Sequence, residues 1–263
     1  MHRLVTGRTP LILLVALFVT GVGCDGRSGS DSSPTFNADP GWHREALQVD
    51  DQHRPFRYYV PTALPDDAAV VMPPHGATIG MDAMFPGTGN APSSEWTTVA
   101  EEDSVLLVVP NATQQTGVVW NDCTPLPEVG GTPDDAGFLV RLTDWITDRA
   151  AVNPDRAYVY GGSNGGQMAN RLAIEHPGRY AGIAAFISNI NSNLGADEEC
   201  PTPAEPVPVL TVSGKRDQTT LFDGGGADVW GEELLSAEAT RDFWVDNNVQ
   251  DDPPSPQPEY RGP

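Results

Sequence analysis

The chain has 263 residues, of which 15 are Lys or Arg and 36 are Asp or Glu, so its formal net charge is −21. Hydrophobic residues make up 39% and charged residues 19%, which is typical of a globular protein with enough chain to bury a core. Binding to nucleic acid or to an anionic membrane surface requires clustered Lys and Arg. The chain has a single lysine, Lys215, so we expect neither nucleic acid nor an anionic membrane surface to be its partner.

The first 24 residues have the parts of an export signal. Arg3 and Arg8 precede the apolar run 11–19, and mostly small residues follow up to Cys24. At about 1.5 Å of rise per helical residue, this run is much shorter than a bilayer core of roughly 30 Å. Residues 21–23 before Cys24 resemble a bacterial lipobox, in which lipidation of the cysteine anchors the mature protein. An ordinary signal peptide with an incidental cysteine is the alternative.

We therefore expect a secreted protein or a bacterial cell-envelope lipoprotein that meets the membrane only through its lipid anchor. Residues 25–45 are expected to form a flexible tether, because their first part is rich in Ser, Gly, Asp and Pro. Residues 46–263 show no internal repeat and no second boundary. They are assigned to a single domain, and the protein is expected to be a monomer.

Apolar runs alternate with helical patterns through this domain. The runs are continuously apolar, which favours strands of a parallel sheet covered on both faces. They lie at 56–60, 69–72, 105–109, 157–160, 182–187 and 207–212, and the helical patterns lie at 134–150, 167–176 and 236–247. The alternation predicts an α/β fold with a mostly parallel sheet flanked by helices.

The strongest chemical signal is the run Gly161-Gly162-Ser163-Asn164-Gly165-Gly166, between an expected strand and an expected helix. A serine in this context sits on a tight turn above the edge of the sheet, and its glycine neighbours leave room for that turn. The backbone N–H of Asn164, at the helix start, can point at a developing oxyanion. We predict that Ser163 is a nucleophile. A structural or phosphate-cradling turn is the alternative, but no Lys-Ser/Thr pair follows, so a P-loop is excluded.

Two further segments complete a hydrolase layout. The loop His75-Gly76-Ala77 follows an apolar run and is expected to supply the second oxyanion N–H from Gly76 or Ala77. His75 itself suits a role in shaping that loop better than the role of general base. Asp217 follows the run 207–212 and is the expected acid, which would orient a histidine and stabilise its cation. A turn aspartate is the alternative, and Asp223 and Asp228 are rivals for the acid.

These segments resemble secreted hydrolases of the polyhydroxybutyrate-depolymerase-like and feruloyl-esterase-like family. The resemblance rests on residues 155–169, 120–123, 134–138 and 208–217, within a likeness that covers about 56–247. It implies an α/β-hydrolase fold, no metal or organic cofactor, and hydrolysis of carboxylic esters through an acyl-enzyme. The chain departs from the family at 213–215, where Ser-Gly-Lys replaces His-Gly-Thr before the acid.

The resemblance also implies a catalytic histidine on a Gly-rich loop after one further strand. The histidines stand at positions 2, 43, 53, 75 and 176, and none follows Asp217. His176 would lie about 20 Å from Ser163 along one helix, at about 1.5 Å per residue. We therefore expect a chain truncated at its C-terminus. The alternative is a surface binding protein that keeps the hydrolase fold and lacks catalysis.

The cysteines agree with export. With Cys24 assigned to lipid, Cys123 and Cys200 are left as an even pair in an oxidising compartment, and we predict a disulfide between them. Two unpaired thiols are the alternative. No spacing of His, Cys and Asp resembles a zinc or calcium site.

Polyesters, feruloylated or acetylated polysaccharides and small esters all fit the expected substrate class.

Overall fold

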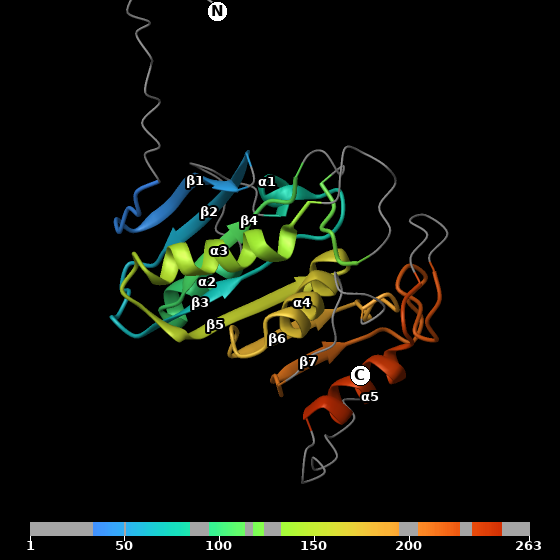
Figure 1. Ribbon diagram of the computed structural model, residues 1–263. Helices are drawn as coiled ribbons and strands as arrows, with labels where there is room; N and C mark the ends of the chain where they lie inside the picture. The colour runs from blue at the N-terminus through green and yellow to red at the C-terminus, as the bar shows by residue number, and fades with distance from the viewer. Residues whose placement is uncertain are drawn as a thin grey trace, which may run out of the picture. The chain divides into compact units, whose positions relative to one another are not determined.

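The computed structural model describes residues 34–49, 51–84, 95–113, 118–123, 133–194, 205–226 and 233–248 (Figure 1). The expected export signal, Cys24, Cys200 and Asp228 lie outside these residues. Within the described ranges, no helix has the length and apolar character that a membrane crossing requires.

Seven strands form one sheet in the order β1-β2-β4-β3-β5-β6-β7. They are β1 Gly41–Val49, β2 Gln52–Val60, β3 Ala68–Met72, β4 Leu106–Pro110, β5 Val152–Gly162, β6 Gly182–Phe186 and β7 Val209–Val212. β2 pairs antiparallel with β1 and β4, whereas all other pairs are parallel. The predicted α/β fold with a mostly parallel sheet is confirmed. The carboxyl ends of β3 to β7 consequently meet at one edge of the sheet.

Five helices accompany the described strands. They are α1 Gly80–Met84, α2 Glu95–Asp103, α3 Asp135–Thr147, α4 Asn164–Glu175 and α5 Ala237–Asn248. The three predicted helical patterns correspond to α3, α4 and α5. α4 begins three residues earlier than the predicted start at 167, because Gly165 and Gly166 lie within its first turn. The short helices α1 and α2 were not predicted.

Side chains on the two faces of β4 pack against different helices. Leu106 and Val108 belong to the main core, together with Phe138 of α3 and Met168 of α4. Leu107 and Val109 alternate with them and belong to a smaller cluster that Met81 and Trp96 extend. The sheet is therefore a middle layer, with α3 and α4 on one face and α1 and α2 on the other. α3 and α4 lie in front of the strands in Figure 1.

The segment predicted to be a tether is partly structured. β1 begins at Gly41 and pairs with β2 along its whole length, so residues 41–45 belong to the sheet. Before β1, Phe36 stacks on Tyr58 at 5.1 Å between ring centroids and meets Trp145 edge-on at 6.4 Å. The sequence did not predict β1, because β1 is an edge strand whose residues are mostly half-buried and whose composition is therefore polar.

Replacing Phe36 by Ala is expected to lower the free energy of unfolding by about 1 to 2 kcal/mol, because part of an aromatic contact with the core is lost. Thr35→Ala, at an exposed neighbouring position, is the matched control and should change little. Urea unfolding measures both. Equal stability of the two variants would show that residues before β1 behave as a free tether.

Candidate active site

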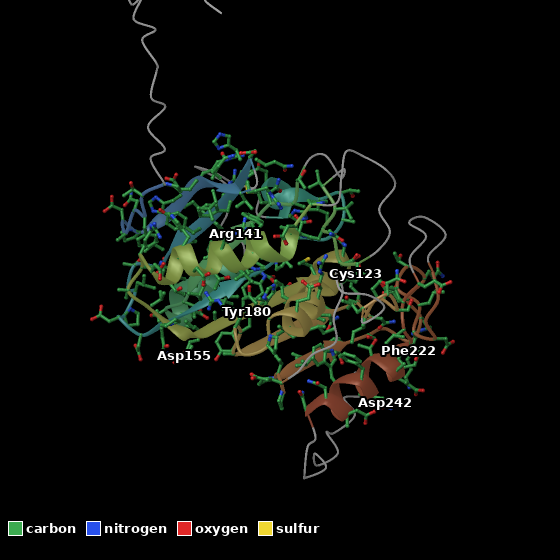
Figure 2. The ribbon with its side chains drawn as sticks, in the orientation of Figure 1. Cys123, Arg141, Asp155, Tyr180, Phe222 and Asp242 are labelled. Carbon is green, nitrogen blue, oxygen red and sulfur yellow. The ribbon has the colours of Figure 1, made fainter. Side chains whose placement is uncertain are left out.

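The predicted site residues meet at the carboxyl edge of the parallel strands. Ser163 follows β5, Asp217 follows β7 and residues 73–77 follow β3. Because β6 alone separates β5 from β7, the serine turn and the acid loop are two strands apart in the sheet. Figure 2 shows Cys123 and Phe222 at this edge, whereas Asp155, near the start of β5, lies at the opposite one.

Ser163 sits on a strained turn between β5 and α4. Its φ is 53° and its ψ is −130°, a combination that residues with a side chain rarely adopt. The Ser163 N–H donates to the carbonyl oxygen of Phe186 at 3.0 Å, which ties the turn to the end of β6. The side chain makes no capping hydrogen bond to the helix it precedes, although Ser often does so. The hydroxyl is thus left to act elsewhere.

The glycines around Ser163 are sterically required. A Cβ on Gly161 would lie within 3.0 Å of the backbone of Gly165, and one on Gly166 would lie 2.6 Å from the Cβ of Ser188. A Cβ on Gly165 would lie 2.7 Å from the carbonyl oxygen of His75. Gly162 has no such neighbour, since its nearest contact would be at 3.9 Å. The pattern Gly-X-Ser-X-Gly therefore reflects the close approach of the serine turn to the loop after β3.

Two backbone segments with free N–H groups meet at the serine turn. A Cβ built on Gly76 would lie 3.9 Å from the Cβ of Ser163, so the loop after β3 touches the nucleophile turn. Among the described residues, no hydrogen-bond partner is found for the N–H of Gly76, Ala77 or Asn164. As the first residue of α4, Asn164 has no intrahelical acceptor for its N–H. Unpaired N–H groups beside a nucleophile are what an oxyanion hole consists of.

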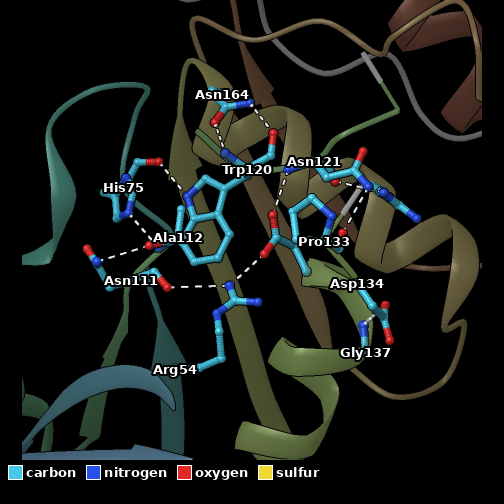
Figure 3. A network of polar contacts seen from close by, with 12 residues as sticks. Arg54, His75, Asn111, Ala112, Trp120, Asn121, Pro133, Asp134, Gly137 and Asn164 are labelled. Carbon is cyan, nitrogen blue, oxygen red and sulfur yellow. Dashed lines mark hydrogen bonds and ion pairs between the residues drawn. The ribbon is translucent and has the colours of Figure 1, made fainter. Parts of the chain in front are cut away.

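The Asn164 side chain fastens a second loop to the serine turn. Its Oδ1 accepts from the Trp120 N–H at 2.7 Å, and its Nδ2 donates to the Trp120 carbonyl oxygen at 3.1 Å. Nδ2 also lies 3.3 Å from Asp122 Oδ2. This amide pairs with the backbone of residue 120 as a neighbouring strand would, as Figure 3 shows. The sequence predicted the backbone role of Asn164 but not this use of its side chain.

His75 is a structural residue rather than a base. Its ring is fully buried, Nε2 accepts from the Ala112 N–H at 3.0 Å, and Nδ1 donates to the Gly76 carbonyl oxygen at 2.8 Å. Burial lowers the pKa of His75 below its ordinary value of 6.5, and the bond to Gly76 opposes that shift. The ring is therefore neutral with its proton on Nδ1, and both nitrogens are occupied. The geometry agrees with the loop-shaping role.

Two hydrogen bonds fix the peptide planes of the loop after β3. The His75 carbonyl oxygen accepts from Trp120 Nε1 at 2.9 Å, as Figure 3 shows, and the Gly76 carbonyl oxygen accepts from the His75 ring at 2.8 Å. In a trans peptide the N–H points opposite to the C=O of the same plane. The N–H groups of Gly76 and Ala77 consequently point away from Trp120 and the His75 ring. Each is held as a donor for which the described part of the chain provides no acceptor.

A buried ion pair supports the loop that carries Trp120. Arg54 of β2 lies 2.5 Å from Asp135 Oδ1, and Asp135 Oδ2 accepts from the Asn121 N–H at 2.8 Å. Arg171 of α4 donates to the Asn121 carbonyl oxygen at 2.7 Å. Burial raises the pKa of Asp135, while the Arg54 guanidinium and the Asn121 N–H oppose the rise. The network links β2, α3 and α4 through one residue of the loop.

Asp217 is held by its own loop. Its Oδ1 accepts from the N–H groups of Thr219 and Thr220 at 2.8 and 3.0 Å, and its N–H donates to the Gly214 carbonyl oxygen at 3.1 Å. The carboxylate is half-buried, whereas the rival Asp223 is exposed. These contacts fix the side chain at the carboxyl edge. They are equally those of a turn aspartate, so the acid role of Asp217 stays a prediction.

The other described histidines lie away from the serine. His176 caps the far end of α4, and His43 and His53 belong to β1 and β2, which β4 and β3 separate from β5. Within the described ranges, then, His75 is the histidine nearest in the fold to Ser163, and both of its nitrogens are occupied. No described histidine is placed to act as a base.

Backbone strain gathers at this edge and was not predicted from the sequence. Seven described non-glycine residues have a positive φ. Five of them lie in loops that follow β3, β4, β5 or β6, namely Thr78, Val118, Cys123, Ser163 and Ile187. Thr, Val and Ile are β-branched, for which a positive φ is a genuine outlier. Such outliers concentrate at functional sites, so their distribution marks the same edge independently.

The described residues include one of the two cysteines of the predicted disulfide. Cys123 takes part in a disulfide. Because Cys200 lies outside the described residues, its pairing with Cys123 stays a prediction. Within the described ranges, no group of three or more His, Cys, Asp or Glu side chains is placed to hold a metal ion.

Ser163→Gly is expected to raise the free energy of unfolding relative to Ser163→Ala by about 1 kcal/mol, because glycine accepts a positive φ without strain while alanine does not. Both variants remove the hydroxyl, so the comparison isolates the backbone. Urea unfolding of the pair measures the difference. A less stable glycine variant would mean that the turn at Ser163 is not strained.

Comparisons with known proteins agree with this geometry. A model of the prolyl oligopeptidase family matches residues 132–195, which include α3, β5, Ser163, α4 and β6. NocK of Nocardia uniformis subsp. tsuyamanensis, named as an esterase, is 36% identical over 106 residues. That match covers 40% of this chain and 30% of NocK. Feruloyl esterase B of Thermothelomyces thermophilus is 26% identical over 148 residues, covering 56% of this chain and 48% of the relative.

The chain thus spans less than half the length of these two curated relatives. A solved structure, poly(aspartic acid) hydrolase-1 from Sphingomonas sp. KT-1, superimposes with a TM-score of 0.53 at 16% identity. The superposition covers 68% of this chain and 73% of that protein. At this level of identity the match is evidence for a shared fold only. The sheet order and the serine turn give the chain an α/β-hydrolase fold, and its sequence is similar to those of esterases.

Proposed function

We propose that the chain is a serine hydrolase of carboxylic esters and that Ser163 is its nucleophile. The observation that carries the proposal is the strained turn at Ser163, next to the N–H groups of Asn164 and of the Gly76 loop, for which the described residues offer no acceptor. If the turn had only a structural role, a glycine would suit it better than a strained serine with a free hydroxyl. Backbone donors without a protein acceptor stabilise a carbonyl oxygen once it becomes negative.

The first half of the reaction forms an acyl-enzyme. Ser163 Oγ attacks the ester carbonyl carbon, and the carbonyl oxygen becomes an oxyanion that accepts from the Asn164 N–H and from Gly76 or Ala77. Collapse of this intermediate breaks the bond to the alcohol oxygen, which leaves with the proton that Ser163 gave up. One oxyanion donor contributes about 10² to 10³ in rate.

The second half returns the free enzyme. Water attacks the acyl carbon, the same N–H groups hold the second oxyanion, and the carboxylic acid departs as Ser163 Oγ regains a proton. In this mechanism a histidine carries the proton, and a carboxylate orients it. Asp217 is the proposed carboxylate, because it follows β7 at the same edge and two backbone N–H groups fix its Oδ1. No base is assigned, since no described histidine is placed for it.

The substrate class follows from the relatives by analogy. Feruloyl esterase B and NocK support an ester substrate for this chain, and we propose a polyester or an acylated or feruloylated polysaccharide. Export is proposed on the N-terminal signal, either as a secreted protein or through a lipid on Cys24. A disulfide between Cys123 and Cys200 would agree with that compartment.

A binding protein with the hydrolase fold is the second candidate. It is favoured by one observation, namely that His75, nearest in the fold to Ser163 among the described histidines, has both ring nitrogens engaged. Such a protein would keep the turn and the acid loop without activating the serine hydroxyl.

A fluorophosphonate probe separates the two candidates, because it phosphonylates only an activated hydroxyl. We expect the full chain to be labelled at Ser163, as peptide mass mapping would show. Labelling should be lost in Ser163→Ala and slowed in Asp217→Asn, because Asp217 is the proposed carboxylate. An unlabelled Ser163 in the folded wild-type chain would favour the binding protein.

Two substitutions of His75 test its control of the oxyanion loop. Asn places an amide nitrogen near the position of Nδ1 and can still donate to the Gly76 carbonyl oxygen. Gln reaches the position of Nε2 and can still accept from the Ala112 N–H. Each variant loses one hydrogen bond, so their stabilities should be similar.

We expect His75→Gln to slow labelling about 100-fold and His75→Asn to slow it far less, because only the Gln variant frees the Gly76–Ala77 peptide. Labelling rates at equal probe concentration measure this. A greater loss in His75→Asn would contradict the assigned role of Nδ1.

A further inference from the structure

Ile187 is one of the strained β-branched residues at the carboxyl edge. It directly follows β6 and has a φ of 44°, although it is β-branched. Its N–H donates to the Val212 carbonyl oxygen at 2.7 Å, which continues the ladder between β6 and β7. The strain is therefore imposed by a fixed backbone.

The position places Ile187 beside the nucleophile. The preceding residue, Phe186, accepts the Ser163 N–H through its carbonyl oxygen at 3.0 Å. Because β6 lies between β5 and β7, residue 187 stands between the serine turn and the acid loop.

Ile187 is also exposed, with 48% of its surface accessible. On the other side of Ser163, Ile79 is 50% exposed, and its Cδ1 lies 3.5 Å from where a Cβ on Gly76 would be. The two sides are distinct because β3, which precedes Ile79, and β6 flank β5 in the sheet. Two exposed isoleucines therefore flank the serine, each next to a backbone segment that contacts its turn.

We propose that Ile187 is a specificity-determining residue that contacts an apolar acyl chain while that chain is bonded to Ser163. This inference rests on the proposed function and names its substrate class, esters whose acyl group is longer and more apolar than acetyl. In an acyl-enzyme the acyl group stays bonded to Ser163 Oγ after the alcohol has left, so a residue beside the serine can contact the acyl group in both halves of the reaction. Ile79 provides a second apolar contact on the opposite side.

The strain supports a role in binding over a role in folding. Glycine at position 187 would adopt the observed φ freely, and an exposed isoleucine gains little from burial within the protein. A strained, exposed, apolar side chain is thus costly for the free protein. It becomes favourable when a ligand covers it, which is how strain at functional sites is retained.

Two variants separate the side chain from the strain. Ile187→Ala removes the side chain and keeps the strained backbone, whereas Ile187→Gly removes both. Val99→Ala, at an exposed aliphatic residue of α2, is the matched control. Activity is measured with p-nitrophenyl acetate and p-nitrophenyl octanoate, which share a leaving group and differ in acyl length.

The ratio of kcat/KM for octanoate over acetate should fall about tenfold in both Ile187 variants, because the longer acyl chain loses more apolar contact than acetate does. Val99→Ala should leave the ratio unchanged. Ile187→Gly should also have a higher melting temperature than Ile187→Ala. An equal loss with both esters would overturn the proposal, since that is the effect of a merely structural residue.

A binding measurement keeps this test separate from the proposed function. Octanoate, the free acid product, is titrated into the full chain and its variants by ¹⁵N NMR. We expect shifts at Ser163 and Ile187 in the wild type and about tenfold weaker binding in both variants. If the wild type turns over neither ester, the proposed function fails. Independently of that result, unchanged octanoate binding in the two Ile187 variants would overturn the role of Ile187.

Discussion

The close approach of two backbone segments is the constraint on which the site depends. Gly165, at the start of α4, lies so near the loop after β3 that a Cβ would fall within 3.0 Å of the carbonyl oxygens of Pro74 and His75. This contact brings Gly76 and Ala77 to the side of Ser163. Three N–H donors and one hydroxyl then occupy the same edge, although they come from two crossovers of the sheet. The strain at Ser163 accompanies that proximity.

Polar side chains, rather than apolar packing, set the orientation of these segments. The Asn164 amide binds both backbone groups of Trp120, and the Trp120 indole binds the His75 carbonyl oxygen. His75 in turn binds Gly76, so a continuous series of hydrogen bonds runs from the nucleophile turn to the oxyanion loop. Buried polar groups of this kind are costly when a partner is missing, so each bond restricts its neighbours. The buried pair of Arg54 and Asp135 extends this restriction into the core.

Much of the fold could be predicted because β3, β4 and β6 are short, mostly buried apolar runs, and because α3 and α4 have clear patterns. β1 could not, since its half-buried edge position leaves a polar sequence that resembles a tether. Ser163 and the 75–77 loop were found from glycine and serine order, which reports backbone geometry directly. The roles of the His75 ring and of the Asn164 side chain depend on partners far along the chain, at 112 and 120, and no local pattern carries them. The strain at Ile187 likewise arises from pairing with β7.

The central claim is that the Ser163 turn and the 75–77 loop form one oxyanion site. A crystal structure of the full chain after reaction with a fluorophosphonate tests it most directly, because the phosphonyl oxygen mimics the oxyanion. We expect the adduct on Ser163 Oγ, with that oxygen 2.7 to 3.1 Å, roughly, from the N–H nitrogens of Asn164 and of Gly76 or Ala77. An adduct on another serine, or a phosphonyl oxygen turned to solvent, would contradict the claim.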